Sequence, residues 1–450
     1  MKAVKVILIV VAVLVVLVVL VVGAAVFFTD RYLHTPVFKE AVLKSAHEEL
    51  GADVRIEELH ASLFSGVELR GVVVGNPPGF TGNLMTAEAF VLRYRLWPLL
   101  HRRVEIEQLS LDKPVITLAR NDAGGWNYEE LGAKEGKAKP ATATPQPAAP
   151  AKSAAATSLD VVLSKLAIDR GTVSMVSEKN KPLVTLEGIN FSSSVSLLDN
   201  KLAGTGKAGI DKISLVDALF VEKVGTPVTF DADQVKLTAL SGTLAKGALA
   251  GDVALKISDG FQYIVNLQVK DSDMGTFFQE AGRKAVLSGT LKATVAVKGT
   301  GGLPTISGNG RAEIDDGKLM EIPLLDLLAT VLQIDMLHDL KFSQCLVEFS
   351  ISNNVMQTPV IRLTSPEIQI TGKGSVSLDD HSLHHNMTLT FTKGVLDRYP
   401  DEIRNVFTEQ PDGSRALDFK VTGTYDKPKT DLGKRILKGI GQQLLQQLSR

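Results

Sequence analysis

The stretch GVELRGVVVGNPPGF, residues 66–80, begins as an alternating strand and ends on two prolines. Apolar side chains stand at Val67 and Leu69 and again at Val72, which is typical of a strand with one buried face. Pro77 and Pro78 have no amide hydrogen to donate, so they end the strand and keep another strand from extending its hydrogen-bonded ladder. The stretch predicts a β-structure in which turn residues delimit each strand.

The spacing of apolar residues in this strand recurs along the chain, with successive steps of two, three and two residues. The copies are Val54, Ile56, Leu59 and Ala61; Val67, Leu69, Val72 and Val74; Val104, Ile106, Leu109 and Leu111; Val161, Leu163, Leu166 and Ile168; and Val184, Leu186, Ile189 and Phe191. An odd step moves apolar side chains to the other face of a strand unless an extra residue is absorbed. Each copy therefore predicts a β-bulge, and a row of bulged strands predicts a twisted, curved sheet. The copies are unevenly spaced, so a solenoid of fixed period is not expected.

A membrane anchor is expected before this β region. Val6–Phe28 contains no charged residue, and at ~1.5 Å per residue it is long enough to cross a ~30 Å hydrocarbon layer. A cleavable signal peptide has a shorter apolar region, of roughly 7–15 residues. Lys2 and Lys5 precede the span, which favours a cytoplasmic N-terminus and a translocated body. A short amphipathic helix is expected directly afterwards, between Thr35 and Gly51.

Composition limits the classes of partner. The chain has 49 basic and 50 acidic residues, so it has no electrostatic footprint for nucleic acid, and no nucleic-acid partner is expected. Cys345 is the single cysteine, which excludes an intramolecular disulfide and a four-cysteine metal site.

Five segments are predicted from the changes in pattern. They are a cytoplasmic start and transmembrane anchor (1–30), a helix and β region (31–132), an Ala/Pro-rich linker (133–157), a large β region (158–430) and an amphipathic C-terminal helix (431–450). The fold class is mainly β with an N-terminal transmembrane helix: a twisted, bulged antiparallel sheet that forms a curved groove or open barrel. Few short helices are expected, namely Met274–Ala281, Pro323–Leu332 and one within Val395–Phe407.

The C-terminal helix has an apolar face formed by Ile436, Leu437, Ile440, Leu444 and Leu448. Two roles stay open for it: it caps the open end of a sheet, or it contacts an envelope protein partner or a membrane surface.

Motifs for catalysis are nearly absent. GTGKAG at Gly204–Gly209 satisfies GxGxxG, but short β segments flank it, which indicates a turn rather than a dinucleotide site. His381, His384 and His385 stand beside two aspartates, which would suit a hydrolase or metalloenzyme, but the residues Asp379–Ser382 are typical of a turn between strands. The sequence contains neither GxSxG nor a P-loop. We expect no enzyme activity, no catalytic residue, no cofactor and no bound metal.

Two N-terminal motifs resemble the AsmA-like family of bacterial envelope proteins. Members share a strand that ends in G-N-P-x-G-F, here GNPPGF, and a later D-G-x-W-N-type segment, here DAGGWN at Asp122–Asn127. The stretches LSGTLKATVAVKGTG, GNGRAEIDDGKLMEIPLLDLL and IRLTSPEIQITGKGSVSLDD resemble the family's C-terminal region. The resemblance covers nearly the whole chain except the linker. The modest length and the alanine-rich linker depart from the larger members.

The resemblance implies an inner-membrane anchor through residues 6–28, a periplasmic body of twisted β-sheet that forms a groove, and a part in outer-membrane biogenesis and lipid homeostasis. The family is similar to the chorein-type bridge-like lipid-transfer proteins of eukaryotes. A phospholipid, bound through its acyl chains, is the implied cargo.

Three functions follow as hypotheses. The first is a lipid-binding or lipid-transfer protein, and the second is a scaffold or regulator of outer-membrane protein or lipopolysaccharide assembly without lipid cargo. The third is a hydrolase or metalloenzyme with the three histidines in its site. The apolar face of a bent sheet must form a closed core, be covered by helices or be offered to lipid. Alternation does not separate a groove from a closed core. The candidate groove residues nearest the membrane are Val54, Ile56, Val67, Leu69, Val104 and Ile106.

Overall fold

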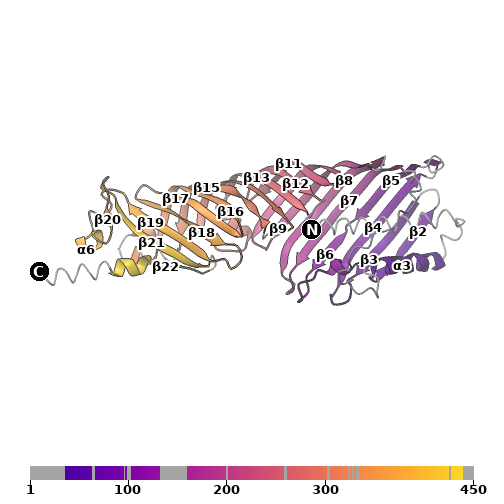
Figure 1. Cartoon of the computed structure of the whole chain (residues 1–450), viewed down its shortest axis with the longest axis horizontal. Coiled ribbons are helices and arrows are strands. Elements are labelled where there is room, and N and C mark those ends of the chain that lie inside the picture. Colours follow the sequence, from indigo (N-terminus) through magenta and orange to yellow (C-terminus); the bar gives the residue numbers. More distant parts are fainter. Residues whose placement is uncertain are drawn as a thin grey trace, which may run out of the picture. The chain divides into compact units, whose positions relative to one another are not determined.

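The computed structural model of the chain describes residues 36–62, 66–95, 97–98, 103–131, 160–198, 201–257, 261–301, 305–322, 325–326, 329–330, 335–424 and 427–438. The expected membrane span, the linker and the last part of the C-terminal helix lie outside these residues. Among the residues described, none of the helices has the length and apolar character needed to span a membrane. The described residues are mainly in β-strands, and the helices among them are few and short (Figure 1).

The chain forms two compact units, which we describe separately. The N-terminal unit comprises residues 1–240 and 255–259, and the C-terminal unit comprises residues 241–254 and 260–450. Strands β11 (Gln234–Leu244) and β12 (Gly247–Lys256) have residues in both units.

The N-terminal unit begins with a helix and continues as a series of strands. Its elements are α3 (Pro36–Leu50), β1 (Val54–Arg55), β2 (Glu58–Ser62), β3 (Gly66–Gly75), β4 (Asn83–Arg95), β5 (Arg103–Asp112), β6 (Val115–Ala119), η2 (Asn127–Glu130), β7 (Asp160–Val176), β8 (Pro182–Leu198), β9 (Lys201–Leu215) and β10 (Leu219–Asp231). The expected helix before the β region is confirmed as α3, and Gly51 follows it with φ 64°, as a C-terminal cap requires. Strand β3 ends at Gly75, directly before the prolines that predicted its end.

Most neighbouring strands of this unit are antiparallel, as predicted, but one step is not. Both β5 and β6 pair with β7 in parallel, whereas the sequence led us to expect an antiparallel sheet throughout. A parallel pair needs a crossover connection of a dozen or more residues. The stretch between Ala119 and Asp160 is long enough to supply it. The predicted linker thus falls between two strands that lie side by side.

The odd steps of the repeated spacing are irregularities of the strands, as predicted. The β4–β5 register shifts beside Ile106, and the β7–β8 register shifts between Leu163 and Leu166. At other odd steps the additional residue adopts a left-handed backbone, with φ 59° at Gly71 and φ 66° at Gly188. Such bulges bend and twist the strands that contain them.

The apolar face of β1–β5 packs against α3. Among the helix side chains whose burial is described, Val42, Ala46 and Leu50 are buried, and they form one core with buried residues of β1 to β5. Figure 1 shows α3 beside these strands. This part of the unit is therefore a sheet with a helix over its apolar face.

The C-terminal unit is an antiparallel series of long strands followed by short elements. Its elements are β13 (Gln262–Asp273), α4 (Met274–Glu280), β14 (Leu287–Thr300), β15 (Ser307–Met320), η4 (Asp335–Leu337), β16 (Asp339–Ser352), β17 (Val355–Thr364), β18 (Ile368–Ser377), β19 (Leu383–Phe391), α6 (Asp401–Arg404), β20 (Thr408–Glu409), β21 (Arg415–Thr424) and β22 (Lys427–Thr430). Strands β13 to β19 each pair with the next, β19 pairs with β21, and β21 also pairs with β20 and β22.

The predicted short helices fare differently. The helix expected at Met274–Ala281 is confirmed as α4, which Asp273 caps by accepting a hydrogen bond from the Thr276 amide at 2.7 Å. Within Val395–Phe407 only α6 is helical, and turns precede it. Of the helix expected at Pro323–Leu332, the structure describes residues 325–326 and 329–330, and all four are helical.

A second core lies at the C-terminal end of this unit. Phe391 and Phe407 meet edge to face there, with ring centroids 5.2 Å apart. Residues 432–438 are helical, and Leu432 and Ile436 are buried in this core, whereas Leu437 is 61% exposed. The described part of the C-terminal helix thus packs into the second core through Ile436 and leaves Leu437 to solvent.

Candidate functional site

The six predicted groove positions occupy two different environments. Val54, Ile56, Val67 and Leu69 are buried beneath α3 and form part of the first core. Val104 and Ile106 lie in β5 and are half-buried, with Val161 and Leu163 of β7 opposite them. The structure brings the first four together in a packed core, and Ile106 packs against the margin of that core.

An apolar face without a described helix over it lies further along the chain, in the C-terminal unit. Its residues alternate along two neighbouring strands: Tyr263, Val265 and Leu267 in β13, and Val295 and Val297 in β14. Val265 lies opposite Val297, and Leu267 lies opposite Val295. All five side chains are half-buried, and none belongs to the second core. We call these five residues the uncovered face.

Aromatic rings on this side of the sheet lie over glycines of the neighbouring strand. Tyr263 is the register partner of Gly299, and a Cβ at Gly299 would stand 2.3 Å from the Tyr263 hydroxyl oxygen. Phe349 of β16 is likewise opposite Gly310 of β15, where a Cβ would lie 2.3 Å from the ring. The rings take the space of the missing side chains, so the face is formed by aliphatic groups and flat rings.

The same side of the sheet leads into the second core. Successive strands place one apolar residue opposite the next in a row, which is half-buried at its start and contains the buried Leu363 and Leu389 toward its end. The row is Leu291, Ile314, Cys345, Leu363, Ile370 and Leu389. Burial raises the pKa of the Cys345 thiol, so this cysteine is a weak nucleophile. The apolar side is therefore filled by protein side chains toward its C-terminal end.

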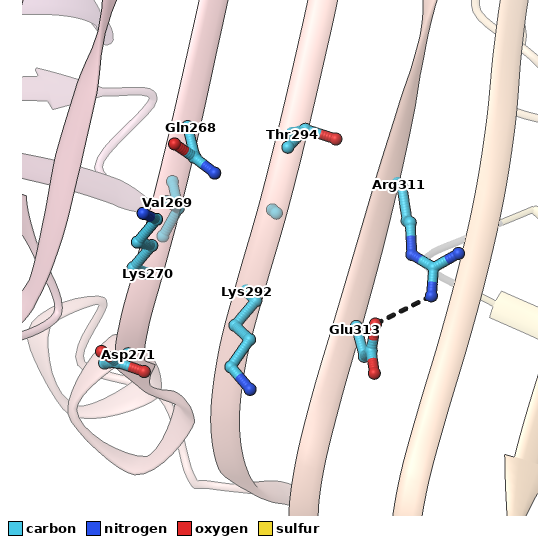
Figure 2. A pocket seen from close by; sticks show the side chains of 9 residues that line it. Gln268, Val269, Lys270, Asp271, Lys292, Thr294, Arg311 and Glu313 are labelled. Carbon is cyan, nitrogen blue, oxygen red and sulfur yellow. Dashed lines mark hydrogen bonds and ion pairs between the residues drawn. The ribbon is translucent and has the colours of Figure 1, made fainter.

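The opposite side of β13–β15 is polar. Figure 2 shows Gln268, Lys270, Lys292, Thr294, Arg311 and Glu313 on one side of these strands. Together with Val269, Asp271 and Ala293 they line a hollow of about 350 Å³. Arg311 donates to Glu313 at 2.9 Å, and Lys292 donates to Asp315 at 2.7 Å. The hydrogen bond from Arg311 holds the pKa of the Glu313 carboxyl below its usual value. Exposed and mutually paired charges of this kind describe a solvated surface rather than a reaction centre.

The two N-terminal motifs meet in space. Asn127 is fully buried; its side-chain amide donates to Asn76 Oδ1 at 2.7 Å and to the Thr117 carbonyl at 2.8 Å, and its Oδ1 accepts from the Ala119 amide at 3.1 Å. Asn76 belongs to GNPPGF and Asn127 to DAGGWN. The motifs therefore tie the end of β3 to the end of β6. The sequence showed both motifs but not that they contact each other.

Two of the three histidines considered for a hydrolase or metalloenzyme site, His384 and His385, do not converge. Adjacent residues of a strand face opposite sides: His384 is exposed, whereas His385 is buried with its Nε2 2.9 Å from Thr358 Oγ1. Burial, and next the neighbouring His384, lower the pKa of His385. The described residues contain no group of three or more metal-ligating side chains.

A model of the AsmA family matches residues 1–234. No curated protein matches the chain, and no solved structure matches it. The matched residues contain the two motifs joined by Asn76 and Asn127.

Proposed function

Because the chain belongs to the AsmA family, we propose that it is an inner-membrane-anchored protein of outer-membrane biogenesis and lipid homeostasis, which binds or transfers phospholipid along an apolar β face. Membership of the family supports a role in the cell envelope in general terms. The phospholipid cargo, the apolar face that binds it and the anchorage in the inner membrane are our proposals.

The observation that carries the proposal is the uncovered face. Val265, Leu267, Val295 and Val297 present aliphatic groups side by side, and Tyr263 adds a ring at their edge. Neighbouring strands lie about 4.8 Å apart, so the paired aliphatic side chains form a strip on which extended acyl chains pack. Each acyl methylene removed from water contributes about 0.8 kcal/mol. The headgroup then stays in water at the margin of the strip.

Transfer along such a face needs no chemistry. An acyl chain that moves from one apolar strip to the next exchanges similar environments, so no step along the sheet has a large free-energy cost. The sequence contains no P-loop, and movement in this proposal follows lipid supply and demand rather than nucleotide hydrolysis. No residue has a catalytic role, and no cofactor takes part.

The same proposal places the chain as a single-pass protein of the bacterial inner membrane. Val6–Phe28 is the anchor, the N-terminus is cytoplasmic, and the bulk of the chain is periplasmic. The uncharged length of this segment and the two lysines before it support that orientation.

A scaffold function is the second candidate, and one observation favours it. Leu437 is 61% exposed on the C-terminal helix, beside Lys434, Arg435 and Lys438 in the sequence. An envelope protein that binds this helix would cover Leu437. In this second function the chain organises outer-membrane protein or lipopolysaccharide assembly and holds no lipid cargo.

A matched pair of variants tests the lipid function. Val295→Asp places a carboxylate on the uncovered face, and Thr294→Asp places the same group one residue earlier on the polar side. Both full-length proteins are purified in one detergent, checked for folding by thermal unfolding and extracted for phospholipid mass spectrometry. Lipid that copurifies with the membrane anchor is present in both samples, so it does not affect the difference between the two variants. We expect less bound phospholipid in Val295→Asp than in Thr294→Asp, whereas equal amounts in two folded proteins would contradict the proposal.

A further inference from the structure

Trp97 is the most exposed large apolar side chain in the described part of the chain, at 81%. It lies between β4 and β5, and Pro98 follows it. An indole has one of the largest apolar surfaces of any side chain, and leaving it in water is energetically unfavourable. Nothing in the proposed lipid face uses this residue, which belongs to the N-terminal unit.

Several strand ends of the N-terminal unit meet where Trp97 lies. The Tyr94 hydroxyl donates to the Ser62 carbonyl at 3.2 Å, so the end of β4 lies beside the end of β2. Arg103, at the start of β5, pairs with Asp160 of β7, and Val161 pairs with Leu197 of β8. Leu198 follows at this same end and is 42% exposed. Trp97 thus stands at an end of the sheet that carries a second exposed apolar side chain.

Helix α3 points its first residues toward this end. Its last residues adjoin β1, which pairs with Val74 near the opposite end of β3. Further back along the helix, Lys39 donates to the Glu57 carbonyl at 2.8 Å. The helix therefore runs along β1 and β2, and its start at Pro36 lies toward the Ser62 end. In the sequence only Thr29–Thr35 separate that start from the uncharged segment Val6–Phe28.

Arginines flank Trp97 on both sides. Arg95 and Arg103 form ion pairs with Glu107 at 2.5 Å and with Glu105 at 3.1 Å. Arg93 is exposed on the same strand as Arg95, and in the sequence His101 and Arg102 add further basic groups. Tryptophan beside arginine is the combination that settles at the headgroup level of a bilayer, where the ring is half in hydrocarbon and the cations meet phosphates.

We propose that Trp97 inserts into the headgroup layer of an anionic membrane, the same membrane that holds the expected anchor, and that Arg93 contacts lipid phosphates there. This inference rests on the anchorage in the proposed function. It fixes the N-terminal unit against the bilayer by a second point of contact besides the anchor.

The two tryptophans of the chain allow a direct test, because each serves as the control for the other. Trp126→Phe leaves Trp97 as the single fluorophore, and Trp97→Phe leaves Trp126, which is half-buried and stacked on Tyr128 with ring centroids 5.9 Å apart. The full chain is placed in nanodiscs of phosphatidylcholine and phosphatidylglycerol, with lipids brominated either near the headgroup or near the chain ends.

We expect bromine near the headgroup to quench Trp97 emission at least about twofold, bromine at the chain ends to quench it less, and Trp126 to be unaffected. Unquenched Trp97 in nanodiscs that hold the protein would overturn the inference and would fit a protein partner at this surface instead. If the full chain fails to associate with nanodiscs, the anchorage and this inference both fall, so the two failures are distinguishable. If Trp126→Phe fails to fold, the difference in quenching between the natural chain and Trp97→Phe gives the same answer.

Discussion

Ile106 of β5 lies directly opposite Leu163 of the parallel strand β7. Each is the second apolar residue of its copy of the repeated spacing, and the remaining positions of the two copies also pair in order: Val104 with Val161, Leu109 with Leu166, and Leu111 with Ile168. Two copies of one pattern therefore lie in register, and their odd steps stand at the same level of the sheet.

The spacing of two, three and two residues is the same when it is followed in either direction along the chain. In the N-terminal unit, copies of this spacing pair in both the parallel and the antiparallel direction. In the antiparallel pairs of the first two copies, Val54 meets Val74, Leu59 meets Leu69 and Ala61 meets Val67. A repeat with this symmetry keeps apolar residues opposite one another whichever way the neighbouring strand runs.

The contact between Tyr263 and Gly299 gives the first prediction. Gly299→Val should destabilise the C-terminal unit by about 1–3 kcal/mol, because the new side chain enters the space of the Tyr263 ring. In a Tyr263→Ala background the same change should cost clearly less. Urea unfolding of the four proteins of this double-mutant cycle measures the difference. An equal cost in both backgrounds would show that the ring does not fill that space.

Much of the local structure follows from the sequence, because local chemistry decides it. The prolines after Gly75 end β3, Asp273 caps α4, and the odd steps mark the bulges. The parallel step was not predictable from the spacing, because a symmetric pattern fits either direction and only the length of the connection between Ala119 and Asp160 argues for it.

The candidate site was less predictable for a physical reason. Val67 and Val295 have the same kind of alternating neighbours, yet α3 covers the first, and the second lies outside the described cores. Alternation identifies which side chains share a face, whereas the cover depends on packing between distant segments. The glycines and the aromatic residues of these strands are visible in the sequence. That a glycine lies opposite a ring, as Gly310 does opposite Phe349, follows only from the strand register.

Asn127 should contribute more to stability than its partner Asn76. Asn127→Ala leaves the Ala119 amide and the Thr117 carbonyl without their side-chain partner in a buried place, which costs about 1–3 kcal/mol. Asn76→Ala removes the hydrogen bond from Asn127 and the exposed bond that Asn76 donates to the Thr81 carbonyl, and should cost less. Denaturant unfolding followed by the emission of Trp126 reports on this region. Equal losses of unfolding free energy in the two variants would contradict the prediction that Asn127 holds this group of hydrogen bonds together.

Stability of the C-terminal unit should depend on pH through His385. Its folded pKa lies below the ordinary 6.5 because burial disfavours the charged ring. The unfolded chain therefore binds a proton more readily, so the contribution of neutral His385 is complete above pH 6.5 and is lost as pH falls through the folded pKa.

Thermal unfolding at pH 7.5 and pH 5.5 measures this effect. His385→Asn should flatten the dependence on pH, whereas His384→Asn, at the exposed neighbour, should retain most of it. The same slope in His385→Asn and in the natural chain would assign the pH dependence to other groups.

The C-terminal helix should stabilise its unit through one side chain and not through the next. Ile436 is 1% exposed in the second core, whereas Leu437 is 61% exposed. Ile436→Ala should cost about 2–5 kcal/mol, and Leu437→Ala should change stability by less than about 0.5 kcal/mol. Comparing their unfolding midpoints is the measurement. A large loss in Leu437→Ala would mean that this side chain packs against the unit.

The central claim is that phospholipid acyl chains lie on the uncovered face, and photo-crosslinking in living cells tests it most directly. The photoreactive residue p-benzoylphenylalanine is introduced at Val295 or, as the matched control, at Thr294 on the other side of the same strand. After irradiation, the full-length chain is digested and its peptides are analysed by mass spectrometry. The account predicts a phospholipid adduct on the peptide with the label at Val295 and none with the label at Thr294. Adducts of equal yield at both positions, or none at Val295 in folded protein, would contradict it.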